Sequence, residues 1–327
     1  MPVDRHQPLS ATESSEGEPG DAGDAGDTTD TFLRQVAAVT DAVASEATPV
    51  LPLDPGEVVG DRFVIERPAG HGGMGTVYRA LDRATGRLAA VKAMARQSQS
   101  AAERFLREAV VLAELSHPRI VRYVSHGLTM HGQPFLAMDW LEGEDLSNRL
   151  ARARLDYRES LSLVRHAGEG LAAAHVRGVV HRDVKPSNLF LLDRDPASIK
   201  VIDFGVARVS EGLSGVTRPG TKLGTAGYMA PEQAMGETDV DARADVYGLG
   251  CVLFECLTGR PPLVGRPAAL LIKVLREEPP RPSTLNPDLS EEADALLARL
   301  LAKDRERRPK DARELLGILD KVGSLVR

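Results

Sequence analysis

The stretch Val179-Val180-His181-Arg182-Asp183-Val184-Lys185-Pro186-Ser187-Asn188-Leu189-Phe190 decides how this chain of 327 residues is interpreted. An apolar pair, Val179-Val180, which we expect to be strand-like, is followed by a short loop with five strongly polar side chains (His, Arg, Asp, Lys and Asn), and the sequence then turns apolar again. So many polar groups next to apolar residues are costly unless the loop does chemistry, and loops on rigid scaffolds often carry function. We therefore predict a catalytic loop.

Upstream, the segment GHGGMGTV at 70–77 spaces three glycines, Gly70, Gly72 and Gly75, and closes on Val77. Glycine clusters also occur in ordinary turns and in dinucleotide-binding folds. In a dinucleotide fold the third glycine opens a helix, whereas here β-branched residues follow it and favour a strand. We expect a strand-turn-strand flap whose backbone N–H groups approach phosphate oxygens, with Val77 available to cover a base.

Lys92 ends an apolar strand, where an unpaired ammonium would be costly. Glu108, sixteen residues later in a helical pattern, is the expected partner, and Glu103 and Glu114 are the alternatives. We prefer Glu108 because Leu112, one turn later on the same face, would turn it toward a core. The pair would direct Lys92 toward the α- and β-phosphates of a nucleotide.

Together these motifs resemble the protein kinase family. The 181–188 loop reads H-R-D-x-K-P-x-N, Asp203-Phe204-Gly205 begins fifteen residues beyond Asn188, and Ala230-Pro231-Glu232 follows. Five motifs in this order are very improbable by chance. The resemblance covers residues 60–322, and the strings GGMGTVYRA and GTAGYMAPEQ are similar to the eukaryotic-type serine/threonine kinases of bacteria.

The resemblance implies roles for the polar loop. Asp183 would accept or orient the proton of a substrate hydroxyl, and Lys185 would neutralise the γ-phosphate, as in the serine/threonine branch of the family. Asn188 and Asp203 would hold Mg²⁺ through oxygen ligands, which this ion prefers. The implied cofactors are therefore ATP and Mg²⁺.

The resemblance also implies a nucleotide pocket. Met138 takes the gatekeeper position, Asp139-Trp140-Leu141 forms the hinge whose backbone would read adenine, and Asp145 falls where a ribose-contacting acid is often found. Three apolar residues would form the roof and floor, although such residues are also typical of an ordinary core: Val77, Ala90 and Phe190. Two positions depart from the family pattern: Asp139 replaces the common Glu, and Arg119 replaces the frequent Asn.

Regulatory and structural residues follow from the same resemblance. The segment 205–225 is rich in Gly, Ser and Thr, and its best phosphosite candidate is Thr217, with Ser214 and Thr221 after it. A phosphate there could pair with Arg182. Three residues would support the fold rather than the chemistry. Asp245 would hold the backbone of the catalytic loop, and Glu232 and Arg308 would form an ion pair.

The implied fold class is α+β, a two-lobed protein kinase fold with a β-rich N-lobe at 60–141 and a mainly α C-lobe at 142–322. Period-two patterns predict N-lobe strands at 63–65, 76–80, 88–92, 120–124 and 134–138, and helical periodicity predicts one N-lobe helix at 101–115. Apolar stripes predict C-lobe helices at 161–176, 244–257, 268–275, 293–301 and 312–322.

Composition sets the remaining expectations. The net charge is −6, and residues 1–57 hold twelve acids and two bases, so we predict a disordered acidic tail there with a short helix at 31–46. The rest of the chain carries a small excess of positive charge without a Lys/Arg run, which does not suggest nucleic-acid binding.

Cys251 and Cys256 match no disulfide or zinc spacing, and we interpret them as core thiols. We see no signal segment or membrane span and expect a cytoplasmic protein.

These observations predict a non-specific serine/threonine protein kinase that acts on protein substrates in bacterial signalling, with activation-loop autophosphorylation and a possible homodimer for transfer in trans. The main alternative is an inactive pseudokinase scaffold, which the presence of Lys92, Glu108, Asp183, Asn188 and Asp203 disfavours. A small-molecule kinase is disfavoured by the long 205–232 segment. The acidic tail could also bind a basic partner.

Overall fold

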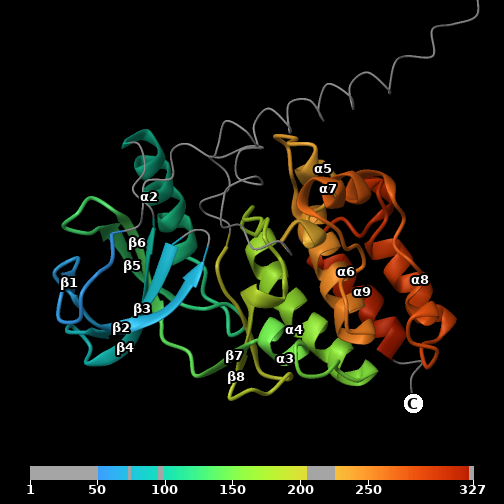
Figure 1. Ribbon diagram of the computed structural model, residues 1–327, viewed down its shortest axis with the longest axis horizontal. Coiled ribbons are helices and arrows are strands. Elements are labelled where there is room, and N and C mark those ends of the chain that lie inside the picture. The colour runs from blue at the N-terminus through green and yellow to red at the C-terminus, as the bar shows by residue number, and fades with distance from the viewer. Residues whose placement is uncertain (1–50, 73–74, 95–98, 205–224, 324–327) are drawn as a thin grey trace, which may run out of the picture.

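Alternating apolar residues build the sheet of the N-lobe. The computed structural model describes residues 51–72, 75–94, 99–204 and 225–323. In the N-lobe, six antiparallel strands form one sheet in the order β1-β2-β3-β4-β6-β5 (Figure 1). The strands are β1 (Val58–Val59), β2 (Phe63–Gly72), β3 (Gly75–Asp82), β4 (Arg87–Met94), β5 (Tyr123–Leu128) and β6 (Pro134–Asp139).

One helix, α2 (Gln99–Ala113), packs on this sheet against β5 and β6. Its buried residues Phe105, Ala109 and Leu112 recur at spacings of four and three, so they lie on one face of the helix. Glu108 is half-buried beside that face. The sequence therefore placed the helix and its apolar face correctly.

The C-lobe is built around α6 (Ala242–Thr258), of whose seventeen residues thirteen are buried, as expected of a helix surrounded by others. Asp241 caps its N-terminus by accepting a hydrogen bond from the Arg243 N–H, and Gly259 ends it in the left-handed conformation. The other helices of the lobe are α3 (Leu146–Leu150), α4 (Tyr157–His175), α5 (Pro231–Ala234), α7 (Pro267–Arg276), α8 (Glu291–Leu300) and α9 (Ala312–Gly323).

A second, three-stranded antiparallel sheet lies at the start of the C-lobe, next to α3 and α4 (Figure 1). It consists of β7 (Gly143–Asp145), β8 (Leu189–Leu192) and β9 (Ile199–Val201). Strand β8 begins directly after Asn188, and Asp203 follows β9 by two residues. The sheet therefore places Asn188 and Asp203, the two predicted metal ligands, close together.

The predicted two-lobed fold class is confirmed, with local corrections. Val179 and Val180, read as strand-like, are not in a strand, and the predicted strand 120–124 begins only at Tyr123. Ile120 instead forms a parallel bridge to Val201 of β9. Both errors arise because a short buried apolar run does not reveal its partner.

The N-terminal tail was predicted to extend to residue 57, but the packed structure begins earlier. Leu53 is buried in the sheet core, and its N–H donates to the Tyr78 hydroxyl at 3.0 Å. The Ile65 N–H donates to the Glu57 carbonyl at 2.9 Å. The predicted helix at 31–46 lies outside the described residues.

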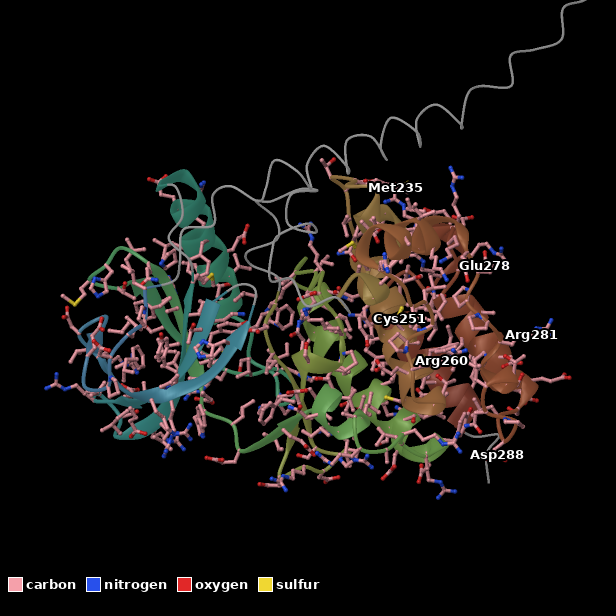
Figure 2. All side chains as sticks on the ribbon, viewed as in Figure 1. Met235, Cys251, Arg260, Glu278, Arg281 and Asp288 are labelled. Carbon is pink, nitrogen blue, oxygen red and sulfur yellow. The ribbon has the colours of Figure 1, made fainter. Side chains whose placement is uncertain are left out.

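Cys251 and Cys256 are buried free thiols on α6, as predicted. Figure 2 labels Cys251 on this helix. Burial raises the pKa of both thiols, which keeps them protonated. Within the ranges that the structure describes, no helix combines the length and apolar character needed to cross a membrane.

Candidate active site

The catalytic loop between α4 and β8 is held by a carboxylate from the centre of the C-lobe. Asp245 of α6 accepts hydrogen bonds from the backbone N–H groups of His181 and Arg182, each at 2.8 Å. Arg182 has a φ of 62°, a left-handed conformation that costs a non-glycine residue about 1–2 kcal/mol. The contact predicted for Asp245 is present, and it stabilises this strained loop.

His181 connects the loop to the segment that follows β9. Its Nδ1 accepts a hydrogen bond from the Asp183 N–H at 3.2 Å, so Nε2 carries the proton and donates to the Ile202 carbonyl at 3.0 Å. The imidazole also packs on the Phe204 ring with centroids 4.5 Å apart. Asp183 and Asp203 are thereby positioned relative to each other through one buried histidine.

Asp183 lies in a compact polar cluster. Its carboxylate is 2.9 Å from the Lys185 ammonium and accepts a hydrogen bond from the Asn188 side-chain amide at 3.1 Å. The same amide donates to the Asp183 carbonyl at 2.7 Å. With Asp183 only 8% exposed, these contacts fix the orientation of its carboxylate. The structure therefore brings together three of the four polar residues predicted to act on substrate or metal.

The fourth, Asp203, meets Lys92. Lys92 Nζ lies 2.8 Å from Asp203 Oδ2, which joins the N-lobe strand β4 to the C-lobe segment after β9. Asp203 also has a positive φ of 57°. The predicted pairing of Lys92 with Glu108 was wrong for this structure: among the described residues, the ion pair of Lys92 within 4.0 Å is the one with Asp203. Glu108 stays on α2, half-buried.

Asn188 and Asp203 carry the donors that the predicted Mg²⁺ requires. The Ile202 N–H donates to the Asn188 carbonyl at 3.0 Å, so Asn188, just before β8, and Asp203, just after β9, lie at adjacent ends of these paired strands. Because the Asn188 amide nitrogen donates to Asp183, its amide oxygen remains for a cation. A carboxylate and an amide oxygen are hard ligands that fit Mg²⁺, which takes its other ligands from water and phosphate.

The predicted nucleotide residues face each other across paired strands. Ala90 is the register partner of Met138, Val77 pairs opposite Lys92, and Asp145 pairs opposite Phe190. Leu141 is half-buried and packs against the main core. The sheet registers thus bring together residues that lie far apart in the sequence.

The three predicted glycines lie at the end of β2 and the start of β3. Gly70 pairs with Val77, and Gly72 pairs with Gly75. Gly75 has a φ of 151°, and a Cβ added there would lie 2.1 Å from the Ala93 carbonyl oxygen. Only glycine fits this position, so the third glycine is required by the close approach of β3 to β4.

Two acids near the hinge have partners within the protein. Asp139 forms a bidentate pair with Arg122, at 3.1 Å from Nε and 2.6 Å from the terminal nitrogen. Asp145 caps α3 by accepting hydrogen bonds from the Asn148 backbone at 3.0 Å and from the Ser147 hydroxyl. The position predicted for ribose contact is therefore also an N-cap.

The predicted structural pair is present in the C-lobe core. Arg308 donates two hydrogen bonds to Glu232, at 2.7 and 2.9 Å, and both side chains are buried. Arg308 also donates to the Ala302 carbonyl at 2.7 Å. The carbonyl groups of Lys303 and Arg243 accept further hydrogen bonds from the guanidinium, so its N–H groups are satisfied as a buried ion pair requires.

Sequence reasoning missed three supporting residues. His175 Nε2 donates to Asp245 at 2.8 Å while its Nδ1 accepts from the Ala312 N–H, and Gln233 donates to the Arg182 carbonyl at 2.9 Å. Tyr123 is buried, which raises the pKa of its phenol, and the Asp203 carboxylate adds to that shift. Two sequence signals could have identified these residues. His175 lies near the end of an apolar helical stripe, and Gln233 directly follows the Ala230-Pro231-Glu232 motif.

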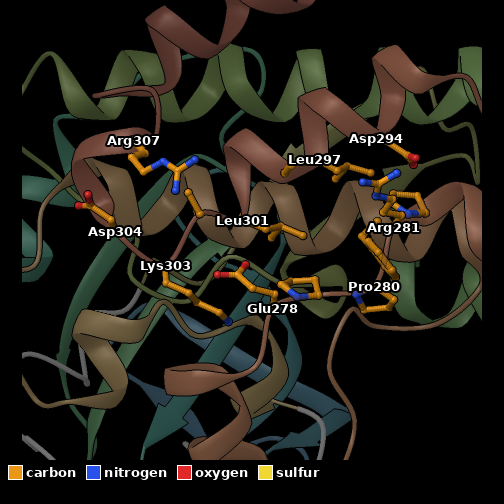
Figure 3. A pocket seen from close by; sticks show the side chains of 14 residues that line it. Glu278, Pro280, Arg281, Asp294, Leu297, Leu301, Lys303, Asp304 and Arg307 are labelled. Carbon is orange, nitrogen blue, oxygen red and sulfur yellow. The ribbon is translucent and has the colours of Figure 1, made fainter.

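A pocket of about 410 Å³ lies elsewhere in the C-lobe, between α6, α8 and the segment 278–282 (Figure 3). Its lining mixes apolar residues such as Leu297 and Leu301 with acidic and basic side chains. Lys303 there donates to the Val274 carbonyl at 2.8 Å, and burial lowers its pKa. None of the lining residues belongs to the predicted catalytic or nucleotide-binding set, so the pocket is separate from this site.

Comparisons with known proteins agree with this geometry. Residues 63–317 match the family described as protein kinase domain. The probable serine/threonine-protein kinase SCO3848 of Streptomyces coelicolor is 39% identical over 267 residues, which are 79% of this chain and 39% of that protein. The chain thus spans about two fifths of the length of the curated relatives it matches.

Solved structures show the same fold. The PknI kinase domain of Mycobacterium tuberculosis is 30% identical, with a TM-score of 0.66 over 83% of this chain and 99% of that chain. Rad53, solved in complex with AMP-PNP, is 28% identical, with a TM-score of 0.65 over 78% of this chain and 64% of that chain.

Proposed function

Because the chain belongs to the protein kinase domain family, we propose that it transfers the γ-phosphoryl group of ATP to serine and threonine hydroxyls of proteins. One observation carries this proposal: the side chains of Lys185 and Asn188 both lie within hydrogen-bonding distance of the Asp183 carboxylate. His181 connects that cluster to the segment that carries Asp203, and this connection supports a single site for phosphoryl transfer.

The catalytic loop supplies the proton and charge chemistry. Asp183 accepts the proton of the attacking hydroxyl, and its contact with Asn188 keeps the carboxylate pointed at one place. Lys185 lies 2.9 Å from Asp183 and neutralises the negative charge on the transferred phosphate. This use of one short loop explains why its strained backbone is tied to Asp245.

Asn188 and Asp203 would hold Mg²⁺ through their amide and carboxylate oxygens. The ion, when bound with ATP, screens the charge of the phosphates. Lys92 would then exchange its contact with Asp203 for one with the α- and β-phosphates. The AMP-PNP complex of the similar Rad53 supports the use of an adenine nucleotide.

We also infer regulation by phosphorylation. Thr217, Ser214 and Thr221, which lie outside the described residues, would receive phosphate from a second copy of the chain and then pair with Arg182. This part rests on the resemblance to bacterial serine/threonine kinases, and it assigns the chain to a signalling system whose substrates are proteins.

Transfer of labelled phosphate from Mg-ATP tests the proposal, with the chain itself and a basic protein as acceptors. The wild type should label serine or threonine. The Lys92→Met and Asp183→Asn variants should each transfer phosphate at least about a hundredfold more slowly. Lys273→Met and Asp288→Asn, which alter exposed residues, serve as matched controls. Nucleotide binding without any transfer by wild type would contradict the proposal and favour a pseudokinase scaffold.

A further inference from the structure

The indole of Trp140, the single tryptophan of the chain, has a fixed orientation beside the hinge. Trp140 directly follows β6, and its ring is half-buried and packs against the main apolar core. The indole N–H donates to the Glu142 carboxylate at 2.7 Å. Packing and this hydrogen bond together hold the ring next to the backbone that is predicted to read adenine.

Two guanidinium groups from the N-lobe sheet lie over this ring. The guanidinium carbon of Arg67 on β2 is 6.0 Å from the centroid of the Trp140 ring, and that of Arg79 on β3 is 5.8 Å away. Both distances are within the range of a cation–π interaction, in which the negative face of the ring attracts a cation. Trp140 therefore interacts with two strands at once.

The two arginines lie opposite each other in the sheet. Arg67 and Arg79 are register partners in the antiparallel pairing of β2 with β3. Like charges directly opposite each other destabilise a sheet. Here the shared ring of Trp140 and the Glu66 carboxylate, which is 3.3 Å from Arg79 Nε, offset that repulsion.

Strand β2 changes register on both sides of Arg67. Its pairing with β3 is irregular between Ile65 and Arg67 and again between Pro68 and Gly70. Such irregularities bend a strand and re-aim its side chains. The local bend therefore accompanies the placement of Arg67 opposite Arg79 and beside the hinge.

The same two strands carry the predicted glycines and the residue predicted to cover the base. Arg79 follows Val77 by two residues, so the two side chains lie on the same face of β3. Arg79 pairs with Ala90 of β4, and Val77 pairs with Lys92. The ring of Trp140 therefore links the hinge to the strands that are predicted to cover the nucleotide.

We propose that Trp140 is a positioning residue that, through Arg67 and Arg79, holds β2 and β3 at a set distance from the hinge. The proposed function places the nucleotide between these strands and the hinge, so the three residues act on nucleotide affinity rather than on phosphate transfer. The proposal rests on the proposed function and extends it.

Nucleotide binding and kinetics test the proposal in the full chain. Trp140→Leu keeps an apolar side chain but removes the aromatic face, so it should raise the Kd for Mg-AMP-PNP and the KM for ATP about fivefold. Its kcat should change less than about twofold, because no reacting group is touched. Trp140→Phe, which keeps an aromatic face, should recover most of the affinity.

Arg83→Gln, at an exposed site in the turn between β3 and β4, is the control for these measurements. It should bind nucleotide as tightly as the wild type does. An unchanged Kd in Trp140→Leu would overturn the proposal.

The two arginines provide a second test, which leaves the ring in place. Arg67→Gln combined with Arg79→Gln should also raise the Kd for Mg-AMP-PNP, and adding Trp140→Leu should weaken binding no further. A further loss equal to that of Trp140→Leu alone would overturn the proposal, because the ring would then act without the arginines. Variants that melt at a lower temperature but bind nucleotide with wild-type affinity would also overturn it, since the contacts would then be only structural.

Tryptophan fluorescence reports directly on these contacts, because Trp140 is the single source of indole emission. Without nucleotide, the emission spectrum of the double arginine variant should differ from that of the wild type. Adding Mg-AMP-PNP should change the emission of the wild type more than that of the variant. Identical spectra of the two proteins would overturn the proposal.

Hydrogen exchange provides a readout that needs neither nucleotide nor catalysis. Amides of β2 and β3 should exchange faster in Trp140→Leu and in the double arginine variant, while those of α8 should not change. Unchanged exchange in β2 and β3 would overturn the inference. A wild type that transfers no phosphate would defeat the proposed function but leave this measurement valid, so the two failures are distinguishable.

Discussion

Lys92 Nζ lies 2.8 Å from Oδ2 of Asp203, so the cation of the N-lobe and the carboxylate predicted to bind metal are partners in this structure. Any cation that binds Asp203 must compete with Lys92 or share the carboxylate with it. The ion pair therefore couples the position of Lys92 to the occupancy of the metal site.

Asp203→Asn tests this coupling. We expect the variant to bind AMP-PNP without Mg²⁺ about as well as wild type, to gain little affinity when Mg²⁺ is added, and to lose at least about a hundredfold of phosphate transfer. Titrations with and without Mg²⁺ measure the effect. A Mg²⁺-dependent gain equal to that of wild type would show that Asp203 does not hold the ion.

The buried pair of Arg308 with Glu232 predicts a large loss of stability when one partner is removed. Arg308→Met should lower the free energy of unfolding by about 3–5 kcal/mol, because it leaves a buried carboxylate without its cation. Adding Glu232→Gln to that variant should restore part of the loss. Thermal melting measures both, and a double variant that melts well below Arg308→Met would contradict this explanation.

Asp82 predicts a pH-dependent contribution to stability. The Arg62 guanidinium holds the pKa of the Asp82 carboxyl well below its usual value near 3.8, with the Thr85 hydroxyl as a further donor. Because the folded-state pKa is lowered, the stabilisation is present above about pH 4 and is lost as the pH falls toward the folded-state pKa.

Asp82→Asn should therefore lower the free energy of unfolding by about 2 kcal/mol at pH 7 and by clearly less at pH 3. Urea unfolding at both pH values measures the difference from wild type. Asp288→Asn, whose carboxylate is 87% exposed, should show no such dependence. A difference that does not shrink at low pH would rule out the ion pair as its cause.

The hinge pair of Asp139 with Arg122 predicts a small effect. Both side chains are more than one third exposed, so the pair contributes at most about 1 kcal/mol. If the hinge reads adenine through its backbone, Asp139→Ala should change the Kd for AMP-PNP less than about threefold. A loss of tenfold or more would show that the side chain itself positions the nucleotide.

Residues near one another in the sequence were the most predictable. The order of the long helices followed from apolar periodicity, and the strands on either side of the glycine segment followed from local patterns. The roles of Asp245, Glu232 and Arg308 followed instead from the family resemblance, because their partners lie 63 to 76 residues away. The N-lobe helix and its buried face followed from the spacing of Phe105, Ala109 and Leu112.

Relations between distant segments were less predictable. The partner of Lys92 depends on how α2 sits relative to β9, which no local pattern encodes. Ile120 looked like a strand residue because it is apolar, but its partner Val201 lies 81 residues away. Asp139 was assigned to the nucleotide, whereas its contact with Arg122 depends on the pairing of β5 with β6. Asp145 was also assigned to the nucleotide, although its contact with Asn148, three residues further on, is a local capping signal.

The attachment of the catalytic loop to Asp245 has an evolutionary consequence. Asp245 lies on α6, a helix of the C-lobe with thirteen buried residues. The geometry of the loop therefore depends on how α6 packs in the core as well as on the loop's own sequence. A substitution deep in α6 would then alter turnover without touching a reacting group. Selection for catalysis and selection for a well-packed interior therefore act on the same residues of this helix.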